Sequence, residues 1–166
     1  LRSPLPEMEF WFPTGRIASE RIDSLCRNHL LGGEPRPPLP ERQLHGMLKG
    51  FADLVFEHDG KYWVLDYKSN RLPGYAAAQL EAAMRHSEYD LQALIYTVAL
   101  HRWLRFRLGD GYDYARDFGG VRYLFCRGLD AGNAASPGVC VWTFAPELVA
   151  ALDALFAGHG DAEAVA

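Results

Sequence analysis

The sequence contains few cysteines and no long apolar run. Its three cysteines, Cys26, Cys126 and Cys140, are far apart and form no Cys-x-x-Cys pair. This pattern predicts neither a zinc site nor a disulfide framework, and it is typical of a cytoplasmic protein. No stretch approaches the roughly 18 consecutive apolar residues that suggest a membrane-spanning helix, so we expect no association with a membrane.

An excess of positive charge and an ATP-binding loop are also absent. The chain has 17 Lys and Arg residues against 21 Asp and Glu residues, and its formal net charge is −4. Non-specific affinity for DNA comes mostly from Lys and Arg that neutralise phosphates, so DNA binding would need a local basic patch or a basic partner. The Gly-x-x-x-x-Gly-Lys-Ser/Thr motif is missing, which excludes an ATP-driven motor of that kind from this chain.

What remains is a composition suited to a folded domain. Of the 166 residues, 49% are hydrophobic and 23% are charged, which is enough apolar material for a buried core. We predict a single domain over residues 1–158. Residues 159–166 lack apolar periodicity and are expected to form a frayed tail.

The pattern of apolar residues predicts an α/β fold with a central mixed β-sheet flanked by helices. Strands are predicted over 7–13, 43–57, 61–69, 121–127 and 139–144, the last as a candidate edge strand, and helices over 75–85, 87–108 and from Pro146 onward. Residues 17–31 suggest a short strand followed by a helix. Residues 32–40 carry four prolines and two glycines, and we expect them to form a loop.

The helix predicted over residues 87–108 has a clear apolar side. This side is formed by Leu91, Leu94, Ile95, Val98 and Leu104. Ser87 followed by Asp90 resembles a capping box that would begin the helix. The helix ends in Arg102, Arg105 and Arg107, where cations suit the helix dipole; a phosphate clamp is the alternative.

The chain is organised around a β-hairpin predicted over residues 49–70. The Asp59-Gly60 pair between two runs of β-branched and aromatic residues is a strong hairpin signal. A two-residue or four-residue loop places Asp53 opposite Asp66, whereas a three-residue loop shifts the register by one. Because side chains alternate along a strand, Lys68 shares the face of Asp66. The other face is expected to point into the core, and it carries Leu54, Phe56, Trp63, Leu65 and Tyr67.

Two directly opposed aspartates repel each other, so their placement needs compensation. A hard divalent cation such as Mg²⁺ binds carboxylate oxygens and retains water, and Asp53 and Asp66 could therefore share one ion. Such an ion lowers the pKa of its water, and Lys68 could orient that water or stabilise the charge that develops on a phosphate. This pattern indicates metal-dependent phosphodiester hydrolysis. The alternative is a solvated Asp66–Lys68 ion pair beside an exposed Asp53.

The same residues resemble a known family. Asp53 followed by Asp66-Tyr67-Lys68 is similar to the PD-(D/E)xK nuclease motif, and a wider set of segments resembles the C-terminal nuclease domain of the RecB family. These segments are residues 46–56, 65–70, 89–96, 99–102, 118–125 and 127–128. The resemblance covers about residues 7–158 and implies a PD-(D/E)xK restriction-endonuclease-like core.

The resemblance also implies a role for each motif residue. Asp53, Asp66 and the backbone carbonyl of Tyr67 would hold Mg²⁺, and Lys68 would act on the attacking water or on the transition state. In the family, a helix ahead of the first strand carries a further metal-binding histidine. No helix precedes residue 7 in this sequence, so we expect a fragment that lacks this ligand and that alone cleaves DNA weakly or not at all.

His45 and His58 are poor replacements for that ligand, whereas the positions of His29, His86 and His101 stay open. Along an extended strand, His45 and His58 would lie about 26 Å and about 17 Å from Asp53. Gln92 and Tyr96 match the family's Gln-x-x-x-Tyr pattern. Because positions i and i+4 lie side by side on a helix, we expect these two residues to hold DNA or to orient the site; routine placement at a surface boundary is the alternative.

Taken with the resemblance, the sequence suggests a Mg²⁺-dependent exodeoxyribonuclease module of a RecBCD-type helicase–nuclease. Its substrate would be DNA, during the processing of double-strand breaks and recombinational repair, and the parent protein would bind RecC-like and RecD-like subunits. A catalytically silent module that only binds DNA or a partner is the main alternative, although the two acids and the lysine are all present. A sequence-specific restriction-type endonuclease is a third and weaker one.

Overall fold

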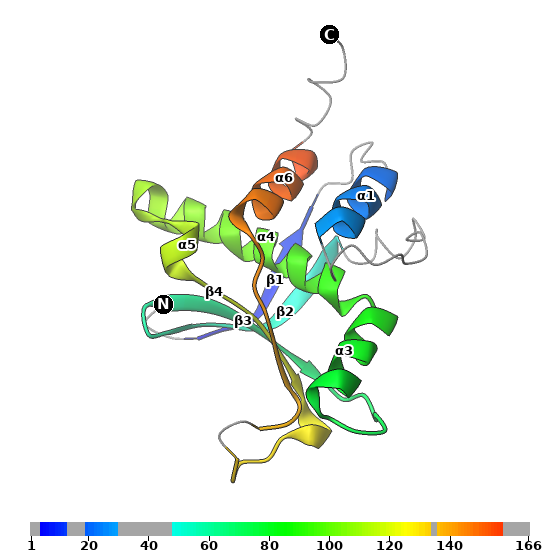
Figure 1. Ribbon diagram of the computed structural model, residues 1–166. Helices are drawn as coiled ribbons and strands as arrows, with labels where there is room; N and C mark the ends of the chain where they lie inside the picture. The colour runs from blue at the N-terminus through cyan, green and yellow to red at the C-terminus, as the bar shows by residue number, and fades with distance from the viewer. Residues whose placement is uncertain (1–3, 13–18, 30–47, 134–135, 158–166) are drawn as a thin grey trace. The chain divides into compact units, whose positions relative to one another are not determined.

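The computed structural model describes residues 4–12, 19–29, 48–133 and 136–157 (Figure 1). The chain divides into two compact units, one of Leu1–Met8 with Phe51–Thr143 and the other of Glu9–Gly50 with Phe144–Ala166. Each unit is therefore described by itself. The single domain predicted over residues 1–158 stays a prediction, and the predicted loop at 32–40 and tail at 159–166 lie outside the described residues.

The chain contains both strands and helices. In chain order they are β1 (Leu5–Trp11), α1 (Ser19–His29), β2 (Lys49–His58), β3 (Lys61–Lys68), α3 (Ala77–His86), α4 (Tyr89–Leu108), η2 (Gly109–Gly111), α5 (Tyr114–Asp117), β4 (Phe118–Phe125), η3 (Cys126–Gly128), β5 (Val139–Trp142) and α6 (Pro146–Phe156). The strands form one sheet in the order β1-β2-β3-β4-β5. Strands β2 and β3 pair antiparallel, β3 and β4 parallel, and β4 and β5 antiparallel. The predicted α/β fold with a mixed sheet is thereby confirmed.

The β2–β3 hairpin has the predicted register. Its turn residues have the positive φ angles that a tight two-residue turn requires, 52° at Asp59 and 73° at Gly60. His58 pairs with Lys61, and the ladder continues inward to the pair of Leu54 and Leu65. One further step along this register leads to Asp53 and Asp66.

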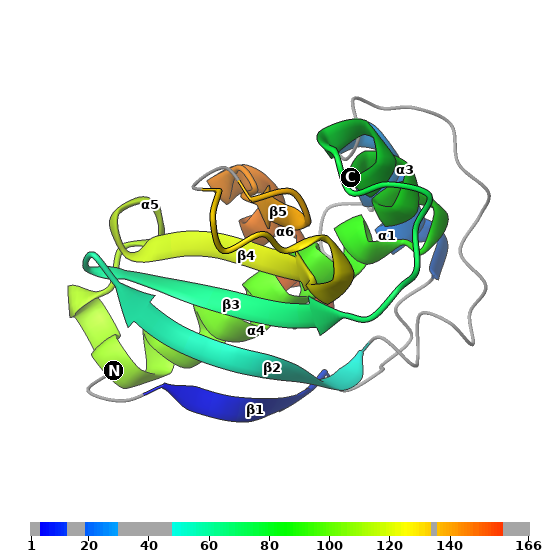
Figure 2. The same ribbon diagram turned by 90° about the horizontal axis from the view of Figure 1, so that it is seen from below.

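The buried face of the hairpin is the reverse of the one predicted. Val55 and Val64, on the face of the acids, are fully buried, whereas Tyr67 on the other face is 52% exposed. Of the five residues predicted to point into the core, only Leu65 is buried. The physical reason is that α4 packs on the face of Val64, against β3 and β4 (Figures 1 and 2). Asp66 and Lys68 therefore lie between the sheet and this helix.

Helix α4 has the predicted apolar side but not the predicted start. Its five predicted core residues are all fully buried: Leu91, Leu94, Ile95, Val98 and Leu104. The capping box was wrong, because Ser87 ends α3 and its backbone N–H donates to the carbonyl oxygen of Ala83. The N-cap residue of α4 is Glu88, which has a φ of 53° and provides no side-chain cap. Only two residues separate the helices, so Ser87 already belongs to the end of α3.

Strand β4 begins three residues earlier than predicted, and Gly119 allows it to approach β3 closely. A Cβ atom on Gly119 would lie 2.2 Å from the Trp63 ring, so only glycine fits at this position. The register between the two strands shifts beside Trp63. Residues 43–47 of the predicted second strand lie outside the described residues, and β2 is seen from Lys49 onward.

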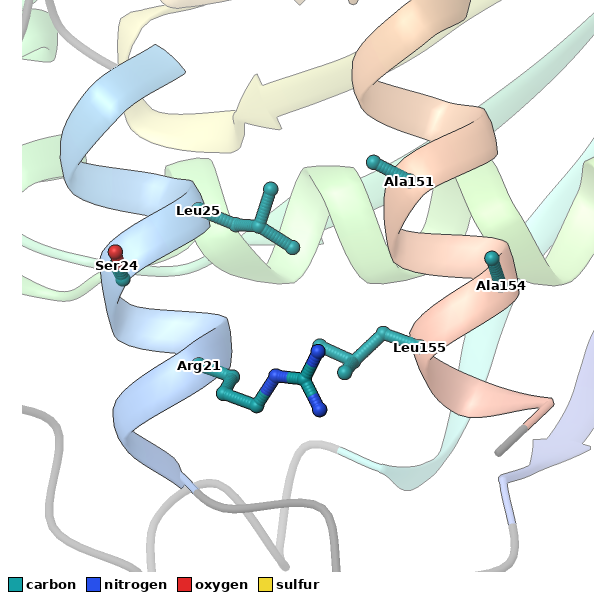
Figure 3. A pocket seen from close by; sticks show the side chains of 6 residues that line it. All are labelled: Arg21, Ser24, Leu25, Ala151, Ala154 and Leu155. Atoms are coloured by element: carbon teal, nitrogen blue, oxygen red, sulfur yellow. The ribbon is translucent and has the colours of Figure 1, made fainter. Parts of the chain in front are cut away.

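The second unit contains two helices that lie side by side, α1 and α6 (Figure 3). Helix α1 covers most of the region predicted as strand plus helix. The rings of Phe12 and Phe156 lie 4.6 Å apart between centroids, and Ile22 and Leu152 are fully buried. A pocket between the two helices is lined by Arg21, Ser24, Leu25, Ala151, Ala154 and Leu155. In the described part of the chain, every helix is too short or too polar to span a bilayer.

Candidate active site

The two motif aspartates lie where the hairpin ladder ends. Beyond the Leu54–Leu65 pair, the backbone N–H of Tyr67 donates to Oδ2 of Asp53 at 2.8 Å. This hydrogen bond brings the Asp53 carboxylate beside the backbone that carries Asp66. The charge of Asp53 is close enough to contribute to a raised pKa of Asp66.

Asp66 is a buried acid with an unusual balance of forces. The residue is only 5% exposed, and this burial is the main cause that raises the pKa of its carboxyl group above the ordinary value. Lys68 opposes the shift: its Nζ lies 2.8 Å from Oδ2 and 3.3 Å from Oδ1 of Asp66. Only the Oδ1 contact has hydrogen-bond geometry, and Oδ2 receives no hydrogen bond from the described residues.

Lys68 is buried as well, with 9% of its surface exposed. Besides Asp66, its ammonium group donates to Oε1 of Gln92 at 2.9 Å. The same nitrogen lies 4.0 Å from the ring centroid of Tyr89 and 4.9 Å from that of Tyr123. Lys68 is therefore not the solvated strand residue of the alternative interpretation. Its ammonium group lies between β3, which carries it, and α4, which carries Gln92.

Gln92 and Tyr96 project from α4 toward the same group of side chains. The Tyr96 hydroxyl lies 3.1 Å from the carbonyl oxygen of Phe51 and 3.4 Å from Oδ1 of Asp66, so it can donate to either. Burial, followed by the nearby charge of Asp66, strongly raises the pKa of the Tyr96 hydroxyl. Tyr96 is thereby kept as a neutral hydrogen-bond donor rather than a base.

Sequence reasoning missed two residues of this group, Tyr89 and Tyr123. Tyr89 lies three positions before Gln92 on α4, a spacing that places both on one side of the helix. Tyr123 is the direct neighbour of Asp66 across the parallel β3–β4 pair. The helical spacing could have drawn attention to Tyr89. Finding Tyr123 required the strand order, which no local pattern provides.

The arrangement suits a hard divalent cation. Two carboxylates lie together, and the buried Oδ2 of Asp66 has an ion contact but no hydrogen bond from the described residues. A cation there would supply the missing coordination and would offset the mutual repulsion of the acids. In the described ranges, no three His, Cys, Asp or Glu side chains gather as a ready metal cluster. The residues present thus fit an ion held by few protein ligands and by water.

Two of the described histidines have contacts other than the two motif aspartates. His58 is at the hairpin turn, with Nε2 3.4 Å from Oδ2 of Asp59. His101 lies 3.0 Å from the hydroxyl of Tyr112 through Nδ1. His45 and His159 lie outside the described residues. The predicted absence of a histidine ligand from this chain stays a prediction.

The mixed sheet places two acids and a buried lysine beneath one helix, an arrangement suited to metal-assisted hydrolysis. Residues 14–136 match the sequence profile of the PD-(D/E)XK nuclease superfamily. Because this match covers more than half of the sequence, the chain belongs to the PD-(D/E)XK nuclease superfamily.

Curated relatives narrow the similarity to one kind of subunit. The chain is 44% identical to the RecBCD enzyme subunit RecB of Escherichia coli K12 over 164 residues, which are 95% of this chain and 14% of the relative. It is 46% identical over 159 residues to the same subunit of Haemophilus influenzae, covering 92% of this chain and 13% of the relative. The subunit of Mycobacterium tuberculosis is 38% identical over 185 residues, with 93% and 17% covered. The chain therefore spans only a small part of the relatives' length.

Proposed function

We propose that this chain is the Mg²⁺-dependent DNA nuclease module of a RecBCD-type helicase–nuclease. The observation that carries the proposal is the convergence of Asp53, Asp66 and Lys68 beneath α4. Asp66 and Lys68 are both buried there, although burying charged groups is costly unless they are paired or bind a metal. A structural role alone does not explain why a second acid is placed beside this pair.

In this proposal, Asp53, Asp66 and the backbone carbonyl of Tyr67 would hold the ion. When bound, Mg²⁺ supplies a water of lowered pKa and charge compensation for the phosphate. The ammonium of Lys68 lies beside the Asp66 carboxylate. From there it would stabilise negative charge on the attacking water or on the transition state. The contact of Lys68 with Gln92 Oε1, at 2.9 Å, would keep the ammonium group oriented when the Asp66 carboxylate binds the ion.

Gln92 and Tyr96 support the site from the helix. Gln92 binds Lys68, and Tyr96 stands within hydrogen-bond distance of Asp66 and of the Phe51 carbonyl. We therefore assign Gln92 to orienting Lys68 and Tyr96 to orienting Asp66. Their position beside the reacting groups is also compatible with contact to DNA.

The wider role is proposed from the relatives. Their name, RecBCD enzyme subunit RecB, supports an assembly with RecC-like and RecD-like subunits. We propose that the module is an exodeoxyribonuclease that shortens DNA at double-strand breaks during recombinational repair. A silent copy would be expected to have lost one of the three motif residues, and all three are present. The restriction-type alternative has no observation in its favour.

Lys68→Gln tests the proposal in the product of the complete gene, assembled with its partner subunits. Linear duplex DNA is incubated with ATP across a Mg²⁺ titration, and cleavage and ATP hydrolysis are measured together. We expect cleavage to fall at least about 100-fold, as for the removal of a stabilising group in other enzymes, while ATP hydrolysis is retained.

The matched control is Lys61→Gln, at the opposite end of the same strand. It should cleave DNA at the wild-type rate. Because Lys68 is buried beside Asp66, the melting temperature of both variants must be recorded to separate lost chemistry from lost folding. Cleavage at the wild-type rate by a folded Lys68→Gln protein would refute the proposed function.

A further inference from the structure

The ammonium group of Lys68 is enclosed by two aromatic rings as well as by polar partners. Its Nζ lies 4.0 Å from the ring centroid of Tyr89 and 4.9 Å from that of Tyr123. The two rings stack on each other, with centroids 5.7 Å apart and an interplanar angle of 25°. The two distances from the ammonium nitrogen to the ring centroids are within the roughly 6 Å over which a ring face attracts a cation.

Each ring is held in place by contacts of its own. The Tyr123 side chain is fully buried, and its hydroxyl lies 3.0 Å from the Tyr89 carbonyl oxygen and 3.1 Å from Oε1 of Gln92. The hydroxyl of Tyr89 donates to Oδ1 of Asn70 at 3.3 Å. The rings are therefore held by β4, by the start of α4 and by the segment that follows β3, through hydrogen bonds to partners other than Lys68.

These contacts differ in kind from the ion pair with Asp66. A lysine side chain is flexible and its ammonium is a compact point charge. A single ion pair therefore does not fix the position of the ammonium group. In the proposed function, the carboxylate of Asp66 is also a metal ligand. The ring faces make no such second interaction, and they attract the cation whether Asp66 is engaged or not.

We propose that Tyr89 and Tyr123 are positioning residues that hold the Lys68 ammonium against the reacting groups. This inference rests on the proposed function, because it presumes that Lys68 takes part in cleavage. Tyr123 supplies the fully buried ring. Tyr89, which is only partly buried, supplies the nearer ring and is the residue at which the idea can be tested without disturbing the core.

The test replaces Tyr89 in the product of the complete gene, assembled with its partner subunits. Tyr89→Phe keeps the ring and removes the bond to Asn70, whereas Tyr89→Leu removes the ring. We expect Tyr89→Phe to cleave linear DNA within about threefold of wild type. Tyr89→Leu should lower kcat by about tenfold, the fold-change that corresponds to one lost cation–π contact, with the KM for DNA and the Mg²⁺ midpoint unchanged.

A second readout does not depend on cleavage. Lysines are labelled with an amine-reactive reagent, and the rate at Lys68 is measured by mass spectrometry relative to Lys61. Loss of the ring in Tyr89→Leu should increase labelling of Lys68, and Tyr89→Phe should not. Tyr62→Leu, at the far end of β3, is the matched control and should change neither kcat nor labelling at Lys68.

Fluorinated phenylalanines at position 89 test the electrostatic origin of the effect with the ring shape preserved. The attraction of a ring face falls as fluorine is added, so kcat should decline from phenylalanine to difluorophenylalanine to trifluorophenylalanine at a constant melting temperature. A flat series, or equal damage from Tyr89→Phe and Tyr89→Leu, overturns the positioning role. If Lys68→Gln itself cleaves normally, the proposed function fails, whereas an inactive Lys68→Gln with a flat series rejects only the positioning role.

Discussion

The backbone N–H of Tyr67 donates to Oδ2 of Asp53 at 2.8 Å, across the two strands of the hairpin and just beyond the end of their ladder. A side chain here takes the place of a backbone carbonyl as the acceptor. This hydrogen bond links the side chain of Asp53 to the backbone of the segment Asp66-Tyr67-Lys68. It holds Asp53 near Asp66 although their charges repel.

Asp53→Asn separates the two roles of this side chain. The amide oxygen can still accept from Tyr67, but the negative charge beside Asp66 is removed. In metal-free buffer at neutral pH, the variant should be as stable as wild type or more stable, because the repulsion between the acids is lost. In Mg²⁺, the rise in melting temperature that an ion bound to the native state produces should be lost.

Thermal melts with and without saturating Mg²⁺ measure both effects. Glu57→Gln, four residues further along β2, is the charge-matched control and should keep the full Mg²⁺-dependent rise. An Asp53→Asn protein that gains as much from Mg²⁺ as wild type would show that Asp53 is not a ligand.

The hairpin and its register could be predicted because their determinants are local. Asp59 and Gly60 supply the positive φ angles of the turn, and the alternation of side chains then fixes the relative position of each residue. The buried face could not be predicted in this way, since both faces of the hairpin carry apolar residues. Packing against α4 decides between them, and α4 begins more than 20 residues after Lys68 in the sequence.

The same distinction applies to the site. The acids and Lys68 belong to one hairpin, so their proximity followed from the register. Gln92 and Tyr96 were expected at the site because they match the Gln-x-x-x-Tyr pattern of the resembled family, but the contact of Gln92 with Lys68 depends on how α4 lies on the sheet. Tyr123 reaches Asp66 through a parallel pairing whose two strands are separated by the whole α3–α4 connection. Such non-local contacts leave no pattern in a single sequence.

Tyr96→Phe should weaken the site through Asp66. Removing the hydroxyl takes away a donor near Oδ1 of Asp66 and near the Phe51 carbonyl, which should cost about 1 kcal/mol of stability. DNA cleavage should fall about tenfold, because the acid is less well oriented. Tyr112→Phe removes a comparable hydroxyl that contacts His101. It should cost similar stability and leave cleavage unchanged, and equal cleavage by the two variants would contradict the role of Tyr96.

Gly119→Ala should destabilise the first unit by steric overlap. The added Cβ would lie 2.2 Å from the Trp63 ring, and overpacking of this kind typically costs about 1–3 kcal/mol. Chemical denaturation measures the change. Gly111→Ala is the control, since a Cβ there meets nothing within 4 Å. The double variant with Trp63→Leu should recover part of the loss, and a Gly119→Ala protein as stable as wild type would contradict the close packing of β3 and β4.

Asp117 should make the stability of the fold depend on acid pH. It accepts two hydrogen bonds from Arg116, at 2.6 Å and 2.8 Å, and one from the backbone N–H of Asp113 at 2.8 Å. The contact with Arg116 is the main cause that lowers the pKa of Asp117 to about 2. The native state therefore releases this proton more readily than the unfolded chain, where the pKa of an aspartate is about 3.9.

For a group whose pKa is lower in the folded state, the stabilisation is fully present above the unfolded pKa and disappears as the pH falls toward the folded one. Wild type should thus exceed Asp117→Asn in stability at pH 7, and the difference should shrink between about pH 4 and about pH 2. Urea denaturation of both proteins at several pH values measures it. Asp110→Asn, on the exposed turn after α4, is the control. A difference between wild type and Asp117→Asn that stays constant down to the lowest pH would show that the ionised Asp117 carboxylate contributes nothing to the fold.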